Sequence, residues 1–425
     1  MPGHKGKVFL GPENMDITEV RGADELYHPR GIIRQSEENA AALFGAGRTA
    51  YSTEGSSLCI RAMIYLALLE AKRAGRRPLI LAGRNAHRTL IHAAALLDAE
   101  IEWLFPETYV SPVSCDLTPA GLDRALAALS DPPAAVYVTS PDYLGSMLDI
   151  RGLSQVCHRR GTVLLADNAH GAYLKFLPED RHPMTLGADL CCDSAHKTLP
   201  VLTGGAYLHV GKNAPEAFFR EADRALALFA STSPSYLILQ SLDRCNAYLS
   251  GEYPAHLAAL ARRLDHMKTR LAEHGYTLVG EETAKLTLAP KACGYTGDGL
   301  HDLLRERGME CEFSDPDFLT AMATPETEIA HLEALERALL EAPKKRPIAD
   351  APPPLFRPRR KLSPRQALLL PARETPVSQA AGHILADAHV SCPPCVPILC
   401  CGEEIDENAV DCFRYYGIET VKVTE

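Results

Sequence analysis

The chain has 425 residues, which is too long for one ordinary core and enough for two or three domains. Apolar residues make up 46% of it and charged residues 23%, the balance of a soluble globular protein. The formal net charge of −10 argues against a general role in binding nucleic acids, whose phosphates attract basic surfaces. The polar N-terminus lacks an apolar signal core, and no apolar run is long enough to span a bilayer, so we expect no secretory signal and no transmembrane helix.

Residues 1–45 contain many glycines and prolines, so they predict an irregular arm with one short helical stretch, Ser36–Phe44. From about residue 55 onwards, helical patterns alternate with short apolar strands. This alternation predicts an α/β fold with a mostly parallel sheet that helices cover on both faces. The expected helices are Leu58–Ala74, Arg88–Leu97, Pro119–Leu129 and Leu153–Arg159, and the expected strands are Pro78–Ala82, Ile101–Phe105, Ala135–Thr139, Val163–Ala166, Leu190–Cys192 and Ala206–Val210.

The second half of the chain predicts two smaller units. Long helical patterns at Ala214–Leu228 and Tyr236–His274 precede a mixed stretch, Leu278–Ala342, that suffices for a small α/β domain. A basic, proline-rich segment follows, with the composition of a linker. The last unit is expected to hold a helix at Pro376–Leu385 and a strand at Val396–Leu399. The predicted division is an N-terminal arm (1–45), a large domain (46–245), a small α/β domain (246–342), a linker (343–362) and a C-terminal α+β domain (363–425).

The 13 cysteines are odd in number and scattered through the chain, which predicts reduced thiols and a cytoplasmic protein. A C-x-x-C pair can bind zinc, but here Pro393 and Pro394 fill its interior and no second C-x-x-C or H-x-x-H follows. We therefore expect ordinary thiols and no metal site in the C-terminal cluster. Its members are Cys392, Cys395, Cys400 and Cys401.

Two apolar strands stop abruptly at small polar residues, in VLLADNAHGAY (163–173) and ADLCCDSAHKTLP (188–200). In an open parallel sheet such strand ends line the ligand crevice. Asp167 ends the first strand, and Lys197 follows the second. Pyridoxal phosphate (PLP) requires a lysine amine that condenses with its aldehyde and a carboxylate that keeps its ring nitrogen protonated. The pair therefore predicts a PLP site, although either residue could also cap a helix or form a surface ion pair.

Two further segments favour this cofactor. Gly55, Ser56 and Ser57 stand just before a long helix, and the N–H groups at a helix N-terminus attract phosphate. Glycine and serine are also routine helix caps. His87 lies beyond a strand end, where its ring could stack on a pyridine or simply be a satisfied polar group.

Several motifs in this order resemble the Orn/Lys/Arg decarboxylases, which belong to PLP fold type I, the aspartate-aminotransferase-like class. The resemblance runs nearly end to end and matches the short form of the family, which has no N-terminal wing domain. The chain begins inside the first of these motifs. The motifs are PGHKG (2–6), DITEV (16–20), RNAHRT (84–89), TSPDYLG (139–145), DNAHGA (167–172), SAHKTL (194–199), TSPSY (232–236) and CPPCVPILCCGEEI (392–405).

The resemblance implies a role for each matching residue. Lys197 would form the Schiff base, Asp167 would pair with the ring nitrogen, and His87 would stack on the ring. His170 would lie near the reacting carbon, with Ala169 under the ring. Because some phosphate contacts would reach a neighbouring subunit, the resemblance also implies a homodimer, at least, with shared active sites. The implied phosphate contacts are Gly55, Ser56, Ser57, Ser194, His196 and, across the subunits, Thr232 and Ser233.

The implied reaction is α-decarboxylation of arginine, lysine or ornithine to an amine of the polyamine pathway. Transamination, aldol cleavage and a PLP-binding protein without turnover remain alternatives, because one fold supports all of them.

The chain departs from the family's pattern at positions that bear on the substrate. Asn168 stands where many members have glutamate, and Glu54 where many have asparagine. Cys392 and Cys395 stand where an aromatic residue and a glycine are common. The acids expected to contact the cationic end of the substrate, unless solvent covers them, are Asp16, Glu19 and Glu54.

Overall fold

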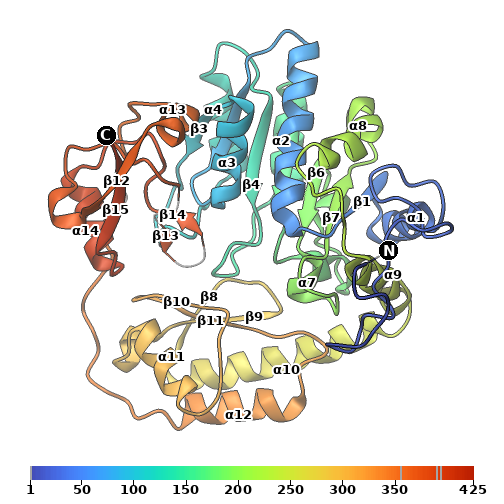
Figure 1. Cartoon of the computed structure of the whole chain (residues 1–425). Coiled ribbons are helices and arrows are strands. Elements are labelled where there is room, and N and C mark those ends of the chain that lie inside the picture. The colour runs from blue at the N-terminus through green and yellow to red at the C-terminus, as the bar shows by residue number, and fades with distance from the viewer. Residues whose placement is uncertain (1, 355–356, 389–390, 393–394) are drawn as a thin grey trace. The chain divides into compact units, whose positions relative to one another are not determined.

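The computed structural model describes residues 2–354, 357–388, 391–392 and 395–425 (Figure 1). The chain forms two compact units, and each unit draws on several stretches of sequence. The first unit comprises residues 1–81, 118–140 and 149–258, and the second comprises residues 82–117, 141–148 and 259–425. The five-part division along the sequence stays a prediction.

The largest sheet has seven short strands. They are β1 (Arg48–Ser52), β2 (Leu79–Gly83), β3 (Glu100–Leu104), β4 (Ala135–Thr139), β5 (Leu164–Asp167), β6 (Leu190–Asp193) and β7 (Ala206–Val210). Their order is β1-β7-β6-β5-β4-β2-β3. β4, β5 and β6 run parallel, with Asp167 paired to Thr139 on one side and to Cys192 on the other. β7 runs antiparallel to β6 and to β1. The predicted α/β fold with a mostly parallel sheet is confirmed.

Every residue of β5, β6 and β7 is buried, because helices pack on the sheet and exclude water from these central strands. No helix among the described residues is long and apolar enough to cross a membrane. The helices of the first unit are α1 (Ile32–Phe44), α2 (Gly55–Arg73), α4 (Pro119–Ala127), α5 (Ile150–Arg159), η1 (Ala172–Phe176), α6 (Pro183–Leu186), α7 (Ala195–Thr198), α8 (Glu216–Ala227), α9 (Tyr236–Ser250) and the start of α10 (Tyr253–His274).

Two expectations for this part of the chain were wrong. The pattern from Tyr236 to His274 predicted one helix, but the structure has two, because α9 ends at Gly251, whose backbone leaves the helical region. β1 was not predicted, since its sequence RTAYS has no apolar run. Its strand conformation comes from pairing with β7 along all five of its residues.

The second unit contains an antiparallel sheet of four strands in the order β10-β11-β9-β8. Leucines of α10, α11 and α12 bury one face of it together with Tyr276 and Tyr295. This confirms the mixed helix and strand content expected for Leu278–Ala342. The elements are α3 (Arg88–Leu97), β8 (Thr277–Val279), β9 (Lys285–Ala289), η2 (Pro290–Cys293), α11 (Gly297–Arg305), β10 (Phe313–Ser314), β11 (Leu319–Met322) and α12 (Ile329–Leu340).

The C-terminal segment of the second unit has its own small core around Leu399, Ile405 and Phe413. The helix expected at Pro376–Leu385 was wrong, because the backbone there bonds to another segment: Gly382 N donates to Ile405 O, and Leu385 N to Glu403 O. The elements are α13 (Pro364–Leu369), β12 (Ala372–Pro376), η3 (Val377–Gln379), β13 (Ser391–Cys392), β14 (Val396–Pro397), α14 (Glu407–Tyr415) and β15 (Thr420–Thr424).

Candidate functional site

Asp167 is the last residue of β5, and its side chain is buried at the end of the strand. Its Oδ2 accepts a 2.7 Å hydrogen bond from the hydroxyl of Tyr137. Its Oδ1 accepts bonds from the backbone N–H of Ala169, at 3.3 Å, and from the thiol of Cys192, at 3.5 Å. These three donors are neutral groups. The site thus offers a buried carboxylate to a positively charged group.

Lys197 lies on α7, which begins directly after β6. Its Nζ is 2.7 Å from Nε2 of His170. His170 is 3% exposed and follows Asp167 by three residues in a tight turn, closed by a hydrogen bond from Gly171 N to Asn168 O of 2.8 Å. The ends of two adjacent strands therefore bring a primary amine and an imidazole into contact, with the carboxylate of Asp167 on the same turn as the imidazole.

The N-terminus of α2 lies beside the start of α7. Gly55, Ser56 and Ser57 form the first turn of α2, and the hydroxyl of Ser194 donates to that of Ser56 over 2.7 Å. Gly55 has a φ of +72°, a conformation that glycine adopts without cost. The first turn of this 19-residue helix carries the partial positive charge of a helix N-terminus and lies next to three hydroxyls, which is the chemistry of a phosphate site.

The remaining predicted phosphate contacts lie in the same unit, His196 on α7 and the other two in the loop before α9. His196 donates from its backbone N and from Nδ1 to the carbonyl of Gly205, at 3.2 and 3.0 Å. Thr232 and Ser233 are exposed. Glu54, expected at the substrate, instead accepts a 2.8 Å hydrogen bond from the backbone N of Ser231 in the same loop.

Three other predicted residues have the following surroundings. Asp16 contacts His4, with 3.2 Å between Oδ2 and Nε2, and Glu19 is exposed. His87 belongs to the second unit, where it caps α3: its Nδ1 accepts the backbone N–H of Thr89 at 3.2 Å. The capping bond fixes the orientation of the imidazole ring of His87. None of these contacts tests a role toward cofactor or substrate, and those roles stay predictions.

Tyr137 is the contact that the sequence did not reveal. It sits in the apolar strand β4, where an aromatic residue is ordinary core. Burial, helped by the neighbouring carboxylate of Asp167, raises the pKa of Tyr137 well above its usual value. The hydroxyl therefore keeps its proton and remains a donor to Asp167. The feature that points to Tyr137 is its position on β4, the strand next to β5. This neighbourhood is known only from the strand order of the folded sheet.

The C-terminal cysteines show no metal cluster among the described residues. Cys400 contacts the guanidinium of Arg84, which also forms a 2.9 Å ion pair with Glu403 in the buried interior of the second unit. The described cysteines are free thiols. The side chain of Cys392 lies outside the described residues. In the part of the chain that the structure describes, the one group of three potential metal-ligating side chains is elsewhere, in the first unit: His182, Asp193 and His209.

A lysine amine, a buried carboxylate and a helix N-terminus lined with hydroxyls match the aldehyde, the ring nitrogen and the phosphate of PLP, in that order. The residues present thus fit that cofactor, and comparisons with known proteins agree. The family model described as the major domain of Orn/Lys/Arg decarboxylases matches residues 6–275.

Curated relatives cover nearly all of the chain. An arginine decarboxylase of Halalkalibacterium halodurans is 28% identical over 446 residues, which is 96% of this chain and 88% of that protein. An arginine decarboxylase of Bacillus subtilis is 27% identical and covers 96% and 88% in the same sense. Among solved structures, lysine decarboxylase A from Pseudomonas aeruginosa has a TM-score of 0.82 at 18% identity, covering 100% of this chain and 78% of that one. At this identity the structural likeness shows the fold alone.

Proposed function

Because the chain belongs to the Orn/Lys/Arg decarboxylase family and is a PLP-dependent decarboxylase, we propose that it removes the α-carboxylate of a basic amino acid as CO2. Arginine is the first candidate, since full-length relatives carry the name arginine decarboxylase, and lysine and ornithine are the others. The observation that carries the proposal is the convergence of Asp167, His170 and Lys197 at two adjacent strand ends. We further propose that the product amine belongs to the polyamine pathway and that the enzyme is a cytoplasmic homodimer.

Bound PLP would supply an electron-accepting ring to which the electrons of the broken Cα–carboxylate bond can move. Lys197 would hold the cofactor through Nζ. Asp167, fixed by the Tyr137 hydroxyl, would keep the ring nitrogen protonated. The first turn of α2 would hold the phosphate, with the hydroxyls of Ser56 and Ser194 beside it.

His170 and Lys197 can pass a proton between them, since their nitrogen atoms are 2.7 Å apart. Only the free amine of lysine is a nucleophile. An imidazole within hydrogen-bond reach can take the proton of the ammonium group and later return it. We assign His170 this role, and with it the position nearest to the reacting carbon.

The site would need acids at the cationic end of the substrate. Glu54 and Asp16 already have partners within the chain, so a substrate would have to displace Ser231 N or His4 to reach them. Glu19 is exposed. These three residues remain candidates, and we propose that the neighbouring subunit helps to complete the pocket, because Thr232 and Ser233 are exposed on one chain.

The proposal is tested by incubating the purified protein and PLP with arginine, lysine and ornithine in turn, and by measuring CO2 release and the mass of the product. We expect the amine of one of them, and no product from the Lys197→Ala variant. Borohydride reduction should attach the cofactor to the peptide that contains Lys197. Labelling of another lysine would contradict the assignment, and a keto acid in place of CO2 and amine would favour transamination.

A further inference from the structure

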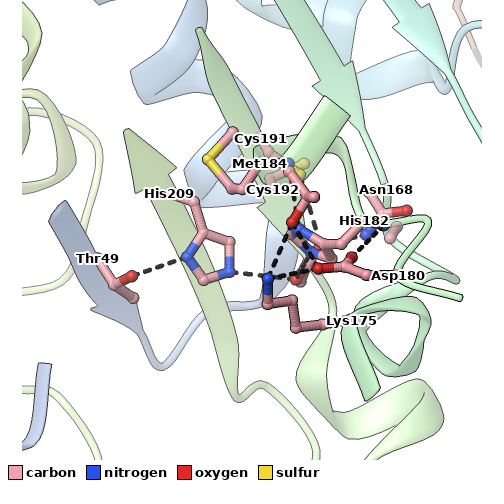
Figure 2. A network of polar contacts seen from close by, with 12 residues as sticks. Thr49, Asn168, Lys175, Asp180, His182, Met184, Cys191, Cys192 and His209 are labelled. Carbon is pink, nitrogen blue, oxygen red and sulfur yellow. Dashed lines mark hydrogen bonds and ion pairs between the residues drawn. The ribbon is translucent and has the colours of Figure 1, made fainter. Parts of the chain in front are cut away.

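Asp193, the last residue of β6, is the centre of a buried polar network in the first unit. Figure 2 shows its partners Asn168, His182 and His209. Its Oδ2 lies 2.9 Å from Nε2 of His182 and 3.1 Å from Nε2 of His209. Its Oδ1 accepts hydrogen bonds from Nδ2 of Asn168, at 2.7 Å, and from the thiol of Cys191, at 3.6 Å. The carboxylate, whose side chain is 0% exposed, thus has a donor for each of its four lone pairs.

The protonation state of the network follows from its outer contacts. Nδ1 of His182 accepts the backbone N–H of Met184 at 3.2 Å, and since a backbone N–H can only donate, Nε2 is the ring nitrogen that donates to Asp193. Burial lowers the pKa of His209, whose Nδ1 lies 2.8 Å from the hydroxyl of Thr49. Burial alone would raise the pKa of Asp193, but the two histidines hold it below its usual range. Asp193 is therefore a buried anion held by hydrogen bonds.

The same three side chains could in principle offer a metal ion one atom each. A metal on Nε2 of His182 would require the proton on Nδ1, where it would face the N–H of Met184. The contacts of Asp193 and His182 therefore fit hydrogen bonding and not metal ligation.

Asn168 connects this network to the candidate active site. It follows Asp167 directly, its backbone N donates to Cys192 O over 3.0 Å, and its carbonyl closes the turn that ends at Gly171. The turn is tight around the side chain, since a Cβ on Gly171 would lie 2.0 Å from Oδ1 of Asn168. The bond from Asn168 to Asp193 thus joins two segments: the turn that carries Asp167 and His170, and the strand end that leads into the helix of Lys197.

We propose that Asn168 and Asp193 are a positioning pair, which sets Asp167 and His170 relative to Lys197. Neither residue touches the reacting atoms. A carboxylate that accepts from four donors has a fixed orientation. The short hydrogen bond from the side-chain amide of Asn168 to Asp193 therefore fixes the position of the turn. The inference rests on the proposed function, but its test measures the binding of PLP and does not depend on turnover alone.

The test exchanges the two side chains. In Asp193→Asn, the new amide must present its NH2 either to the histidine N–H groups or to the NH2 of Asn168, so one strong contact is lost. In Asn168→Asp, two carboxylates face each other. In the double variant, Oδ1 of the new asparagine can face the histidines while its NH2 donates to the new aspartate. The exchange restores the strong contacts with their direction reversed.

Three quantities are measured on the full chain: the dissociation constant of PLP, the visible circular dichroism of bound PLP, and the melting temperature without cofactor. Loss of one hydrogen bond to a charged group predicts that each single variant binds PLP roughly 10- to 100-fold more weakly, with an altered dichroism band. The double variant should recover most of the affinity and the wild-type band. Thr49→Val is the matched control, because it removes the outer contact to His209 and leaves Asn168 in place. It should lower the melting temperature without changing the PLP measurements.

Two results would overturn the proposal. In the first, the single variants have a lower melting temperature, as Thr49→Val does, while PLP affinity and dichroism stay at wild-type values. The network would then contribute only to the stability of the core. The other is a double variant as impaired as the single ones, or one that does not fold. If wild-type protein binds PLP but decarboxylates no basic amino acid, the proposed function fails, and the PLP measurements still decide the positioning role.

Discussion

The hydroxyl of Tyr137 donates a 2.7 Å hydrogen bond to Oδ2 of Asp167 from the neighbouring strand β4. Both side chains are buried, and the pKa of Tyr137 is raised well above its usual value by that burial, so its proton stays in place. A neutral donor orients the carboxylate without cancelling its charge. This arrangement supports the proposed pairing of Asp167 with a protonated ring nitrogen.

Replacing Tyr137 by phenylalanine removes this donor and leaves the ring. A hydrogen bond to a charged group contributes about 1.5–3 kcal/mol, so we expect PLP affinity and kcat/KM to fall roughly 10- to 100-fold. Titration with PLP and steady-state CO2 release measure the two effects. Tyr207→Phe is the control, because Tyr207 is buried in β7 of the same sheet and has no described bond to Asp167. Equal losses in both variants would mean that packing alone is responsible.

The contact between His170 and Lys197 predicts a loss of rate without a loss of cofactor. His170→Gln keeps the size of the side chain but cannot exchange a proton at neutral pH. General acid–base groups contribute about 100- to 10,000-fold to rate, and we expect kcat to fall by that order while PLP still binds. His256→Gln, which changes an exposed histidine of α10, should leave kcat unchanged. A His170→Gln enzyme with normal kcat and a normal pH profile would contradict the role.

Shared sites predict recovery of activity by subunit mixing. Neither a chain with Thr232→Val and Ser233→Ala nor a Lys197→Ala chain should be active alone. In a mixed dimer, one site combines the intact lysine of the first chain with the intact Thr232 and Ser233 of the second, and the other site carries both defects. Activity should therefore return when chains exchange, because cofactor binding and assembly are linked. Demonstrated exchange without activity would place the contact within one chain.

Glu37 predicts a pH dependence of stability that is separate from catalysis. Its side chain is 1% exposed, and burial raises its pKa from the ordinary 4.5 to about 8, against the hydrogen bond from Tyr51 N and the charges of Arg48 and Arg34. The folded state holds the proton more tightly than the unfolded one. The stabilisation is thus complete below pH 4.5 and is lost as the pH rises through about 8.

Replacing Glu37 by glutamine should remove its contribution to the change of the unfolding free energy with pH. That contribution is about 1.4 kcal/mol per pH unit at most. Urea unfolding of both proteins at pH 5 and pH 8 measures it as the change in their difference. We expect the glutamine variant to gain stability relative to wild type as the pH rises. A difference that stays constant would show that Glu37 titrates normally.

The ion pair of Arg84 and Glu403 predicts an asymmetry between single and double variants. Both side chains are less than 10% exposed, so Arg84→Met leaves a buried carboxylate without its cation, at about 3–5 kcal/mol. The double variant Arg84→Met with Glu403→Gln should lose less. Lys361→Met breaks the more exposed pair with Glu404 and should cost about 0–1 kcal/mol. Denaturant unfolding measures the free energy of unfolding of the three variants. A double variant less stable than Arg84→Met would contradict the expected cost of an unpaired buried carboxylate.

Local patterns sufficed to predict most of the fold and the two principal residues of the site. Each strand of the large sheet except β1 is a short apolar run with turn residues beside it, and the runs that end at Asp167 and before Lys197 stop at polar residues. Both signals lie within a few neighbouring residues, so folding is not needed to see them. The helix expected at 376–385 failed because its backbone is bound by residues 403–405, which no local pattern announces.

The contacts that complete the site depend on the tertiary structure. Tyr137 reaches Asp167, and Asn168 reaches Asp193, because β4, β5 and β6 are neighbours in one register. His170 meets Lys197 because a turn and a short helix leave adjacent strand ends. Strand order and register are set by packing between segments 25 to 30 residues apart, and the same apolar runs could pair in other orders. The candidate site residues can therefore be proposed from the sequence, while their hydrogen-bond partners are decided by how the sheet assembles.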